Sequence, residues 1–144
     1  MCSPAGHPAP RPDGDSRPPA SRISSGSPYE ERIGFSRAVR VGDRVLVSGT
    51  APVWPDGSCP DDAGVQARRC FEIVEGALAE AGASLADVVR TRQYLVHRED
   101  ADAVMNAHGE CFSAVRPAST MILVAGLLDP RWRVEIEAEA VVRD

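Results

Sequence analysis

The stretch RPASTMILVAGLLDPRWRVEIEAEAVV, residues 116–142, decides the fold. It contains two runs typical of β-strands, STMILVAG and RVEIEAEAVV, joined by a short loop. In the second run, apolar residues alternate with Glu135, Glu137 and Glu139, so the three carboxylates share one face of the strand. The pattern predicts a final strand with one buried face and one acidic face.

The rest of the chain alternates between strand and helix signals. A hairpin comes first, followed by a long helix, a strand rich in β-branched residues and a second helix. The predicted elements are strands Phe35–Val39 and Val45–Ser48, a helix from Asp61 or Asp62 to Gly82, a strand over 87–97, and a helix from Asp100 or Asp102 that ends before Pro117. With the two final strands, this is an α+β domain of order ββαβαββ. Two helices can cover only one face of such a sheet, so the other face meets solvent or another copy of the chain.

All sixteen basic residues are arginine, and this excludes several kinds of site. Without lysine, the chain has neither a Schiff-base lysine nor the lysine of a Walker-type phosphate loop. The four cysteines lack the spacing of a metal site, so we expect no disulfide framework and no metal site. A net charge of −5 and few aromatic residues also argue against nucleic-acid binding.

The first 28 residues differ in composition from the rest. They contain seven of the twelve prolines and no aromatic residue, so they bury too little apolar surface to offset the entropy of ordering. We expect a disordered leader over 1–28 and one domain over 29–144. The chain shows no secretory signal and no apolar run long enough for a membrane, so we expect a cytoplasmic protein without a membrane partner.

The acidic face of the final strand has two interpretations. Alternating apolar and acidic residues are ordinary in a half-exposed strand, and periodicity alone favours that interpretation over a catalytic carboxylate. Successive carboxylates lie about 7 Å apart, so covering them requires compensation by arginines or by another subunit. Arg90 and Arg92 alternate on the predicted central strand and can supply that opposite charge.

A more specific signal comes from the motifs taken together. In chain order, GFSRAVRVGDRVLVSGTAP, QARRCFEIVEGALAEAGASLADVVRTRQYL, MNAHGECF, RPAST and VEIEAEAV resemble the RidA/YjgF family, over nearly the whole chain from about Ser27. The resemblance implies a chorismate-mutase-like fold with two helices on one face of a mixed sheet. It also implies a homotrimer with a central barrel, ligand clefts between subunits, and cofactor-independent hydrolysis of small reactive imines and enamines to ketones and ammonia.

The resemblance also implies a set of cleft residues. Glu135 stands at the glutamate that opens the acidic strand, and it is the expected catalytic residue. The family's Ser-Gly after the second strand is Ser48 and Gly49, and its helix asparagine is Asn106. The other positions implied to bind substrate are Phe35, where tyrosine is common, Thr50, where glutamine is common, and Met121, where cysteine is common.

The chain departs from the family at the Pro-Ala-Arg motif, which here reads Pro117-Ala118-Ser119. An arginine binds a carboxylate through two charge-assisted hydrogen bonds, whereas a serine hydroxyl offers one neutral donor. We therefore expect Ser119 to face a neutral imine, enamine or cyclic precursor rather than a 2-imino acid. Arg116 is an alternative anion-binding group, but it lies roughly 10 Å upstream along an extended chain, where an exposed strand-edge arginine is the simpler interpretation.

Two other classes of function stay open. A protein that holds a metabolite in the same clefts without turnover fits the loss of the arginine and tyrosine nearly as well as an enzyme does. RNA cleavage, attributed to some family members, is opposed by the negative charge and the absence of lysine. His108 lies on the apolar stripe of the second helix, where a packed or interface histidine is favoured over a catalytic base.

Overall fold

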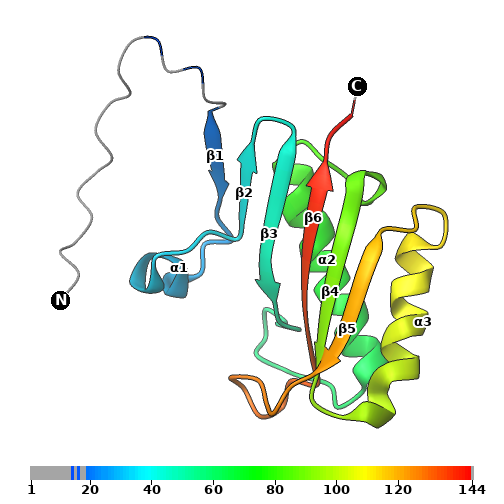
Figure 1. The fold of residues 1–144 in the computed structure, drawn as a ribbon. Helices are drawn as coiled ribbons and strands as arrows, with labels where there is room; N and C mark the ends of the chain where they lie inside the picture. The colour runs from blue at the N-terminus through cyan, green and yellow to red at the C-terminus, as the bar shows by residue number, and fades with distance from the viewer. Residues whose placement is uncertain (1–13, 15, 17–18, 144) are drawn as a thin grey trace.

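The computed structural model describes residues 14, 16 and 19–143. In this part of the chain, one six-stranded sheet lies in front of two long helices (Figure 1). The strands are β1 (Ala20–Ile23), β2 (Ala38–Val41), β3 (Arg44–Thr50), β4 (Val88–Leu95), β5 (Ala118–Leu123) and β6 (Val134–Val141). The helices are α1 (Pro28–Ile33), α2 (Ala63–Glu80) and α3 (Ala101–Phe112), with short 3-10 turns η1 (Leu85–Asp87) and η2 (Arg98–Asp100) before β4 and α3.

The sheet is mixed and has the order β1-β2-β3-β6-β4-β5. Strands β4 and β5 are parallel, and the other neighbouring pairs are antiparallel. Helices α2 and α3 contact each other and lie behind the sheet in Figure 1, so neither of these two helices covers the front face, which we call the uncovered face of the described residues. The predicted α+β fold, with two helices on one face of a mixed sheet, is confirmed.

The core lies between the sheet and the two helices. Every second side chain of β6 is buried against them, and every third or fourth side chain of α2 packs back onto the sheet. The core residues of these two elements include Val134, Ile136, Ala138 and Ala140 from β6, and Phe71, Val74 and Leu78 from α2. Burial of one such valine, leucine or phenylalanine contributes about 1.5–3 kcal/mol, so this packing fixes the strand that carries Glu135.

The limits of α2 follow from its cap residues. The Asp62 side chain accepts a hydrogen bond from the Val65 amide at 2.9 Å, which satisfies a donor in the first turn. Gly82 follows the helix with a φ of 79°, a conformation that favours glycine. Asp61, the other predicted cap, is instead ion-paired with Arg133 at 2.8 Å. No helix in the described ranges is long and apolar enough to cross a membrane.

The structure differs from the sequence prediction over the expected disordered leader. Residues Ala20–Ile23 form β1, which pairs antiparallel with β2. A strand can form here without a large apolar side because the main chain of β2 offers it hydrogen-bonding partners, and composition does not show such pairing. The other expected leader positions 1–13, 15 and 17–18 lie outside the described residues.

Helix α1 is also absent from the sequence prediction. It begins at Pro28, a residue suited to the first helical turn, and the Ser27 side chain accepts from the Tyr29 amide. The buried Glu30 carboxylate accepts a hydrogen bond from the Ser25 amide at 3.1 Å. Because the connection from α1 occupies 34–37, the hairpin begins at Ala38 rather than Phe35.

Candidate functional site

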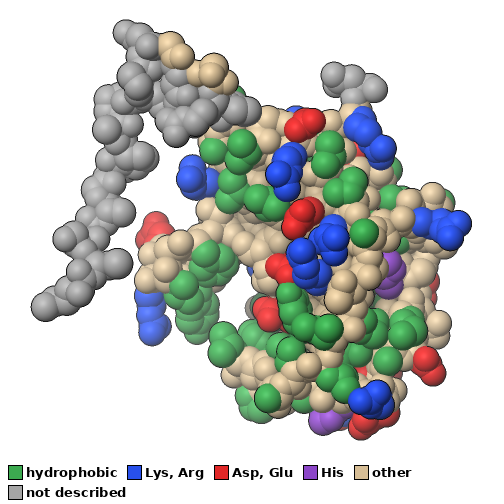
Figure 2. All heavy atoms as spheres, in the orientation of Figure 1, with side chains coloured by type: hydrophobic (Ala, Val, Ile, Leu, Met, Phe, Trp, Pro, Cys, Tyr) green, Lys and Arg blue, Asp and Glu red, His purple; other side chains and the backbone are tan. Residues whose placement is uncertain are grey.

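The acidic side chains of β6 lie on the uncovered face of the sheet, and two of them are compensated by neighbouring strands. Arg92 Nη1 lies 3.7 Å from Glu137 Oε1 and 3.3 Å from Glu139 Oε1. The Tyr94 hydroxyl donates a hydrogen bond to Glu137, and Arg44 Nη2 lies 3.8 Å from Glu139. Figure 2 shows basic and acidic side chains next to each other on this face. The predicted compensation by Arg92 is confirmed, and both glutamates have structural partners.

Arg90 and Glu135 lie toward opposite ends of the antiparallel pair formed by β4 and β6. Arg90 lies opposite Glu139 in the pairing of β4 with β6, but the ion pairs of Glu139 are with Arg92 and Arg44, so compensation by Arg90 stays a prediction. Glu135 lies opposite Tyr94 and lines a cavity of about 460 Å³ between α1 and the sheet. The gap between α1 and the body of the molecule is visible in Figure 2. We call this space the Glu135 cavity; its apolar wall includes Ile33, Phe35, Leu128 and Trp132.

The environment of Glu135 changes its acidity. Burial raises the pKa of the Glu135 carboxyl; the Arg37 guanidinium opposes this rise and the Glu137 carboxylate adds to it. A carboxylate with a raised pKa is a stronger base once ionised, and it releases a proton less readily. Glu135 thus combines access to a cavity with the chemistry of a proton acceptor.

Gly49 allows the Glu135 carboxylate to lie against the backbone. A Cβ added at Gly49 would lie only 3.2 Å from Oε1 and 3.4 Å from Cδ of Glu135. Gly49 lines the cavity, and its role in binding substrate stays a prediction. The Ser48 hydroxyl donates to the Ser36 carbonyl at 2.6 Å and so holds this segment to the α1–β2 connection. Thr50 lies in the core, fully buried, and its hydroxyl donates to the Ser48 carbonyl at 2.8 Å.

Arg37 is a cavity residue that the sequence prediction misses. Its Nη2 donates to the Ser48 carbonyl at 2.8 Å and to the Gly49 carbonyl at 2.6 Å. Burial lowers the pKa of Arg37, and the carboxylates of Glu30 and Glu135 oppose that shift. The available signal is its position two residues after Phe35, on the same side of an extended segment. Arg37 fixes the backbone against which Glu135 lies and supplies a positive charge beside it.

A second hollow, of about 290 Å³, lies between α3 and the edge strand β5. We call it the Ser119 hollow. Ser119 and Met121, both predicted to bind substrate, line it. The other lining residues are Gln93, Met105, His108 and Gly109. Among these described residues none carries a full charge when His108 is neutral, so the hollow is polar but uncharged.

Four side chains form a continuous hydrogen-bonded chain at the Ser119 hollow. The Ser119 hydroxyl donates to Gln93 Oε1 at 3.2 Å and accepts from the Thr91 hydroxyl at 2.9 Å. Thr91 Oγ1 is in turn 2.8 Å from His108 Nε2. Each hydroxyl has a single hydrogen, so in this arrangement His108 Nε2 donates to Thr91. The donor expected of Ser119 is therefore already used within the protein.

His108 has both a packing role and a polar role. Its ring lies 5.8 Å from the Phe71 ring centroid and 4.8 Å from that of Phe112. Burial lowers the pKa of His108, which favours the neutral imidazole. The predicted packed histidine is confirmed. Its hydrogen bond to Thr91 is additional, and only the tertiary structure brings these two residues together.

Asn106 and Arg116 lie outside both hollows. Asn106 is exposed on α3, and Arg116 is exposed just before β5 with a φ of 56°, in the left-handed region. Neither residue lines the Glu135 cavity or the Ser119 hollow within one chain. A role for either in binding substrate stays a prediction.

The two hollows lie on opposite faces of the sheet. Ser119 is bonded to Thr91 and Gln93, which are buried on the side of β4 that faces the helices. Glu135 alternates with the buried Val134 and Ile136, so it faces the other side. The two hollows share no lining residue. One copy of the chain therefore does not bring Glu135 and Ser119 to the same ligand.

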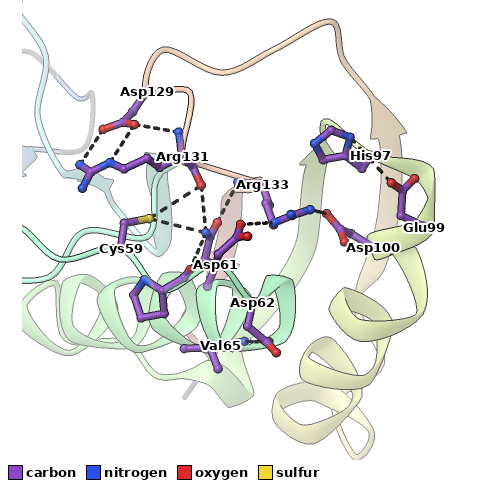
Figure 3. A network of polar contacts seen from close by, with 12 residues as sticks. Cys59, Asp61, Asp62, Val65, His97, Glu99, Asp100, Asp129, Arg131 and Arg133 are labelled. Carbon is purple, nitrogen blue, oxygen red and sulfur yellow. Dashed lines mark hydrogen bonds and ion pairs between the residues drawn. The ribbon is translucent and has the colours of Figure 1, made fainter.

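A polar network holds Asp129, Arg131 and Arg133, at the end of the loop before β6 (Figure 3). Trp132 lies in the same segment and lines the Glu135 cavity. Arg133 bridges Asp61 at 2.8 Å and Asp100 at 3.0 Å. Gln66, buried in α2, donates to the Arg131 carbonyl at 3.0 Å. A hollow of about 360 Å³ beside this network is lined by charged groups that are paired with one another. We regard the network as a support for the cavity wall.

Metal-ligating side chains are dispersed. Within the described part of the chain, no group of three or more His, Cys, Asp or Glu residues is placed to hold a metal ion. Cys59, Cys70 and Cys111 are free thiols, and burial, together with the nearby Glu135 carboxylate, raises the pKa of Cys70. Cys70 is buried and Cys111 is half-buried.

Several known proteins are similar to this chain in sequence. A family model described as Endoribonuclease L-PSP matches residues 28–142. An uncharacterised protein of Streptomyces coelicolor is 44% identical over 120 residues, which cover 83% of this chain and 90% of that protein. A protein of Escherichia coli named 2-iminobutanoate/2-iminopropanoate deaminase is 34% identical over 115 residues, which cover 76% of this chain and 88% of that protein.

A solved structure shows the same fold. A crystal structure of a member of the YjgF/YER057c/UK114 family from Mycobacterium tuberculosis matches with a TM-score of 0.80 and 41% sequence identity. The match covers 86% of this chain and 100% of that chain.

Proposed function

The chain belongs to the RidA/YjgF family, and from this premise we propose that it hydrolyses a neutral imine or enamine in a cleft between subunits. The observation that carries the proposal is the Glu135 carboxylate in its cavity, placed against Gly49 and raised in pKa by burial. Some relatives of this chain are named imine deaminases.

Glu135 is the proposed proton acceptor and donor. Water adds to the carbon of the C=N bond while the Glu135 carboxylate takes a proton from that water. Glu135 returns this proton to nitrogen, which gives a carbinolamine. It then takes the proton of the new hydroxyl as the C=O bond forms and delivers it to nitrogen, so the C–N bond breaks and the products are a carbonyl compound and ammonia. Arg37 holds the Ser48 and Gly49 backbone that positions this carboxylate. Phe35 and Trp132 supply apolar walls of the cavity.

We propose a neutral substrate because the described lining residues of the Ser119 hollow supply no positive charge to bind an anion. A charge-assisted hydrogen bond contributes about 1.5–3 kcal/mol, and the two bonds of the family's arginine are absent here. The Ser119 hydroxyl already donates to Gln93, so it is not free to replace one of them. The E. coli relative is named for two imino acids, which are anionic; we expect this chain to prefer a substrate without that carboxylate.

The proposed assembly is a homotrimer with a central barrel. Glu135 and Ser119 face opposite sides of the sheet, so a cleft containing both needs residues from two copies. The uncovered sheet face and the exposed apolar residues Tyr29, Ile33 and Phe35 around α1 suit burial between copies. A location in the cytoplasm is part of the proposal, and the free thiols of Cys59, Cys70 and Cys111 support a reducing compartment.

A binding protein without turnover is the second candidate. The observation that favours it is Phe35 in the cavity wall, where a tyrosine hydroxyl would add a donor. In this case the same cleft would hold a metabolite and Glu135 would only accept a hydrogen bond. Saturable binding of a ligand is then expected without product formation.

Ammonia release tests the proposed function. Neutral imines and 2-imino acids are generated in situ by an amino-acid or amine oxidase, and ammonia is measured with and without the protein. We expect acceleration that is greatest with the neutral imines. Binding without acceleration would establish the second candidate. Light scattering on the same samples tests the trimer, and a monomer at micromolar concentration would contradict the intersubunit cleft.

A further inference from the structure

The Ser119 hollow contains a buried polar group that the proposed chemistry does not use. Gln93 is 2% exposed, and its Nε2 has no hydrogen-bonding partner among the described residues. Leaving a buried donor unpaired costs stability, and such groups are rare in folded proteins. A leucine or methionine would fill the same position without that cost, so the amide points to a partner outside this chain's own side chains.

Resting on the proposed function, we propose that Gln93 and Ser119 together bind an uncharged carboxamide or lactam group of the substrate. Gln93 Nε2 offers two hydrogens, and its Oε1 already accepts from Ser119. Ser119 Oγ donates once and accepts once, from Thr91, so it retains one lone pair. The site thus presents a donor beside an acceptor. An amide with its C=O and N–H on the same side presents the complementary pair.

A carboxylate fits this pair less well. It is an acceptor only, so it satisfies Gln93 Nε2 but places a second lone pair against the lone pair of Ser119 Oγ. No described lining residue offers it a positive charge, because burial lowers the pKa of His108 and keeps the imidazole neutral. Burying an anion without such a partner is costly. The hollow therefore selects the uncharged group over its acid.

The remainder of the ligand also has a place. Met105 and Met121 form the apolar part of the Ser119 hollow and continue into an adjoining hollow whose lining includes Leu95 and Leu123, with the exposed Arg98 also in that lining. Methionine side chains are unbranched and adapt to irregular shapes, so they can move aside and open Gln93 Nε2 to a ligand. A small apolar body that carries a carboxamide or lactam fits this combination.

Nuclear magnetic resonance on the full chain tests the inference directly. The probes are isobutyramide, the lactam 2-pyrrolidinone and, as the matched acid, isobutyrate. The readouts are the side-chain amide signals of Gln93 and the methyl signals of Met105 and Met121. We expect the amide and the lactam to shift these signals and to bind at least about tenfold more tightly than isobutyrate, equivalent to about 1.4 kcal/mol.

Two variants make the result specific. Gln93→Met keeps an unbranched side chain of similar volume at a buried position, so the fold is retained, and amide affinity should fall by about tenfold. Thr120→Ala removes a hydroxyl from the neighbouring β5 residue that faces away from the hollow and should leave affinity unchanged. Equal or tighter binding of isobutyrate, unchanged affinity in Gln93→Met, or no shift of Gln93 at the solubility limit of the amides would overturn the inference.

The outcome does not depend on catalysis. Amide binding without ammonia release from any imine leaves the inference standing and contradicts the enzymatic function. Ammonia release from neutral imines without amide binding at Gln93 supports the enzymatic function and contradicts the inference.

Discussion

The Glu135 cavity and the Ser119 hollow differ in whether the polar groups that line them are charged. In the cavity, a carboxylate and a guanidinium are half-buried near each other and a glycine makes room for the carboxylate. In the hollow, Ser119, Thr91, His108 and Gln93 are linked by hydrogen bonds between neutral groups. The first is suited to moving a proton and the second to recognising an uncharged group. The fold separates these tasks on opposite faces of one sheet, so each can change independently.

Replacing the carboxylate of the cavity should have the largest effect. General acid–base catalysis contributes about 10²–10⁴-fold, so Glu135→Gln should lower the rate of ammonia release from a neutral imine by that factor. The control is Glu110→Gln, because Glu110 is exposed on α3 and paired with Arg68. Light scattering should show the same assembly for both variants. Retention of activity in Glu135→Gln would remove the proton-transfer role from the cavity.

Charging the hollow should have the next largest effect. Ser119→Arg supplies two charge-assisted donors in place of the neutral chain, so the preference for 2-imino acids over neutral imines should rise by tenfold or more. Relative kcat/KM values on the two substrate types measure this change. Ser119→Met is the matched control because it adds length without charge. If both variants shift the preference equally, side-chain size rather than charge decides specificity.

Crowding the carboxylate should have a smaller effect. In Gly49→Ala the new Cβ would lie 3.2 Å from Glu135 Oε1, so the carboxylate must move by a few tenths of an ångström. Because a misplacement of 1 Å can cost about 10²-fold, we expect kcat to fall by about tenfold or less. The control is Gly76→Ala in α2, where nothing lies within 4 Å. That change should keep kcat and raise stability by up to about 1 kcal/mol.

The smallest effects should be on stability. The effect of replacing Glu135 in the cavity should depend on pH, and the effect of replacing Gln93 in the hollow should not. Burial raises the pKa of Glu135 above its ordinary value of 4.5, so the folded chain holds this proton more tightly than the unfolded chain. The resulting stability is present below pH 4.5 and is lost as the pH rises through the raised pKa. At neutral pH, Glu135→Gln should therefore unfold at higher denaturant concentration than the unchanged chain, and the difference should vanish near pH 4.

A substitution of a buried polar residue in the hollow allows the pH dependence of stability to be compared with that in the cavity. Gln93→Met removes a buried unpaired amide, and we expect a gain of about 1 kcal/mol in the free energy of unfolding. Gln93 does not ionise, so the gain should be the same at neutral and acidic pH. A gain that varies with pH would show that the hollow is electrostatically coupled to a titrating group.

Periodicity and motif order were sufficient for most of the fold. The alternation in β6 predicts which side chains are buried, and Asp62 and Gly82 mark the limits of α2. Strand β1 and helix α1 are not predictable in the same way. The first depends on pairing with β2 and the second on local capping by Ser27, within a proline-rich segment.

The candidate site was predictable only in part. Glu135, Phe35 and Gly49, which the resemblance assigns to a substrate cleft, line one cavity of the single chain, and their roles stay predictions. The positions of Arg37 and Gln93 in the two hollows are not predictable from the sequence, because an arginine or glutamine in an alternating strand is usually solvent-exposed. Their burial follows from tertiary contacts with the β3 carbonyls and with Ser119. The homotrimer and the substrate stay predictions.

The central position of β6 has a consequence for synthesis of the chain. This strand is close to the C-terminus, yet it lies between β3 and β4 and is hydrogen-bonded to both. Among the described strands, β1–β3 and β4–β5 are two groups that share no ladder without β6. Because residues 134–141 follow all five of these strands in the chain, they are made after them; they join the two groups and also carry Glu135. A ribosome-bound chain that lacks residues 134–141 should be sensitive to protease along its whole length, and release of those residues should make it resistant in one step.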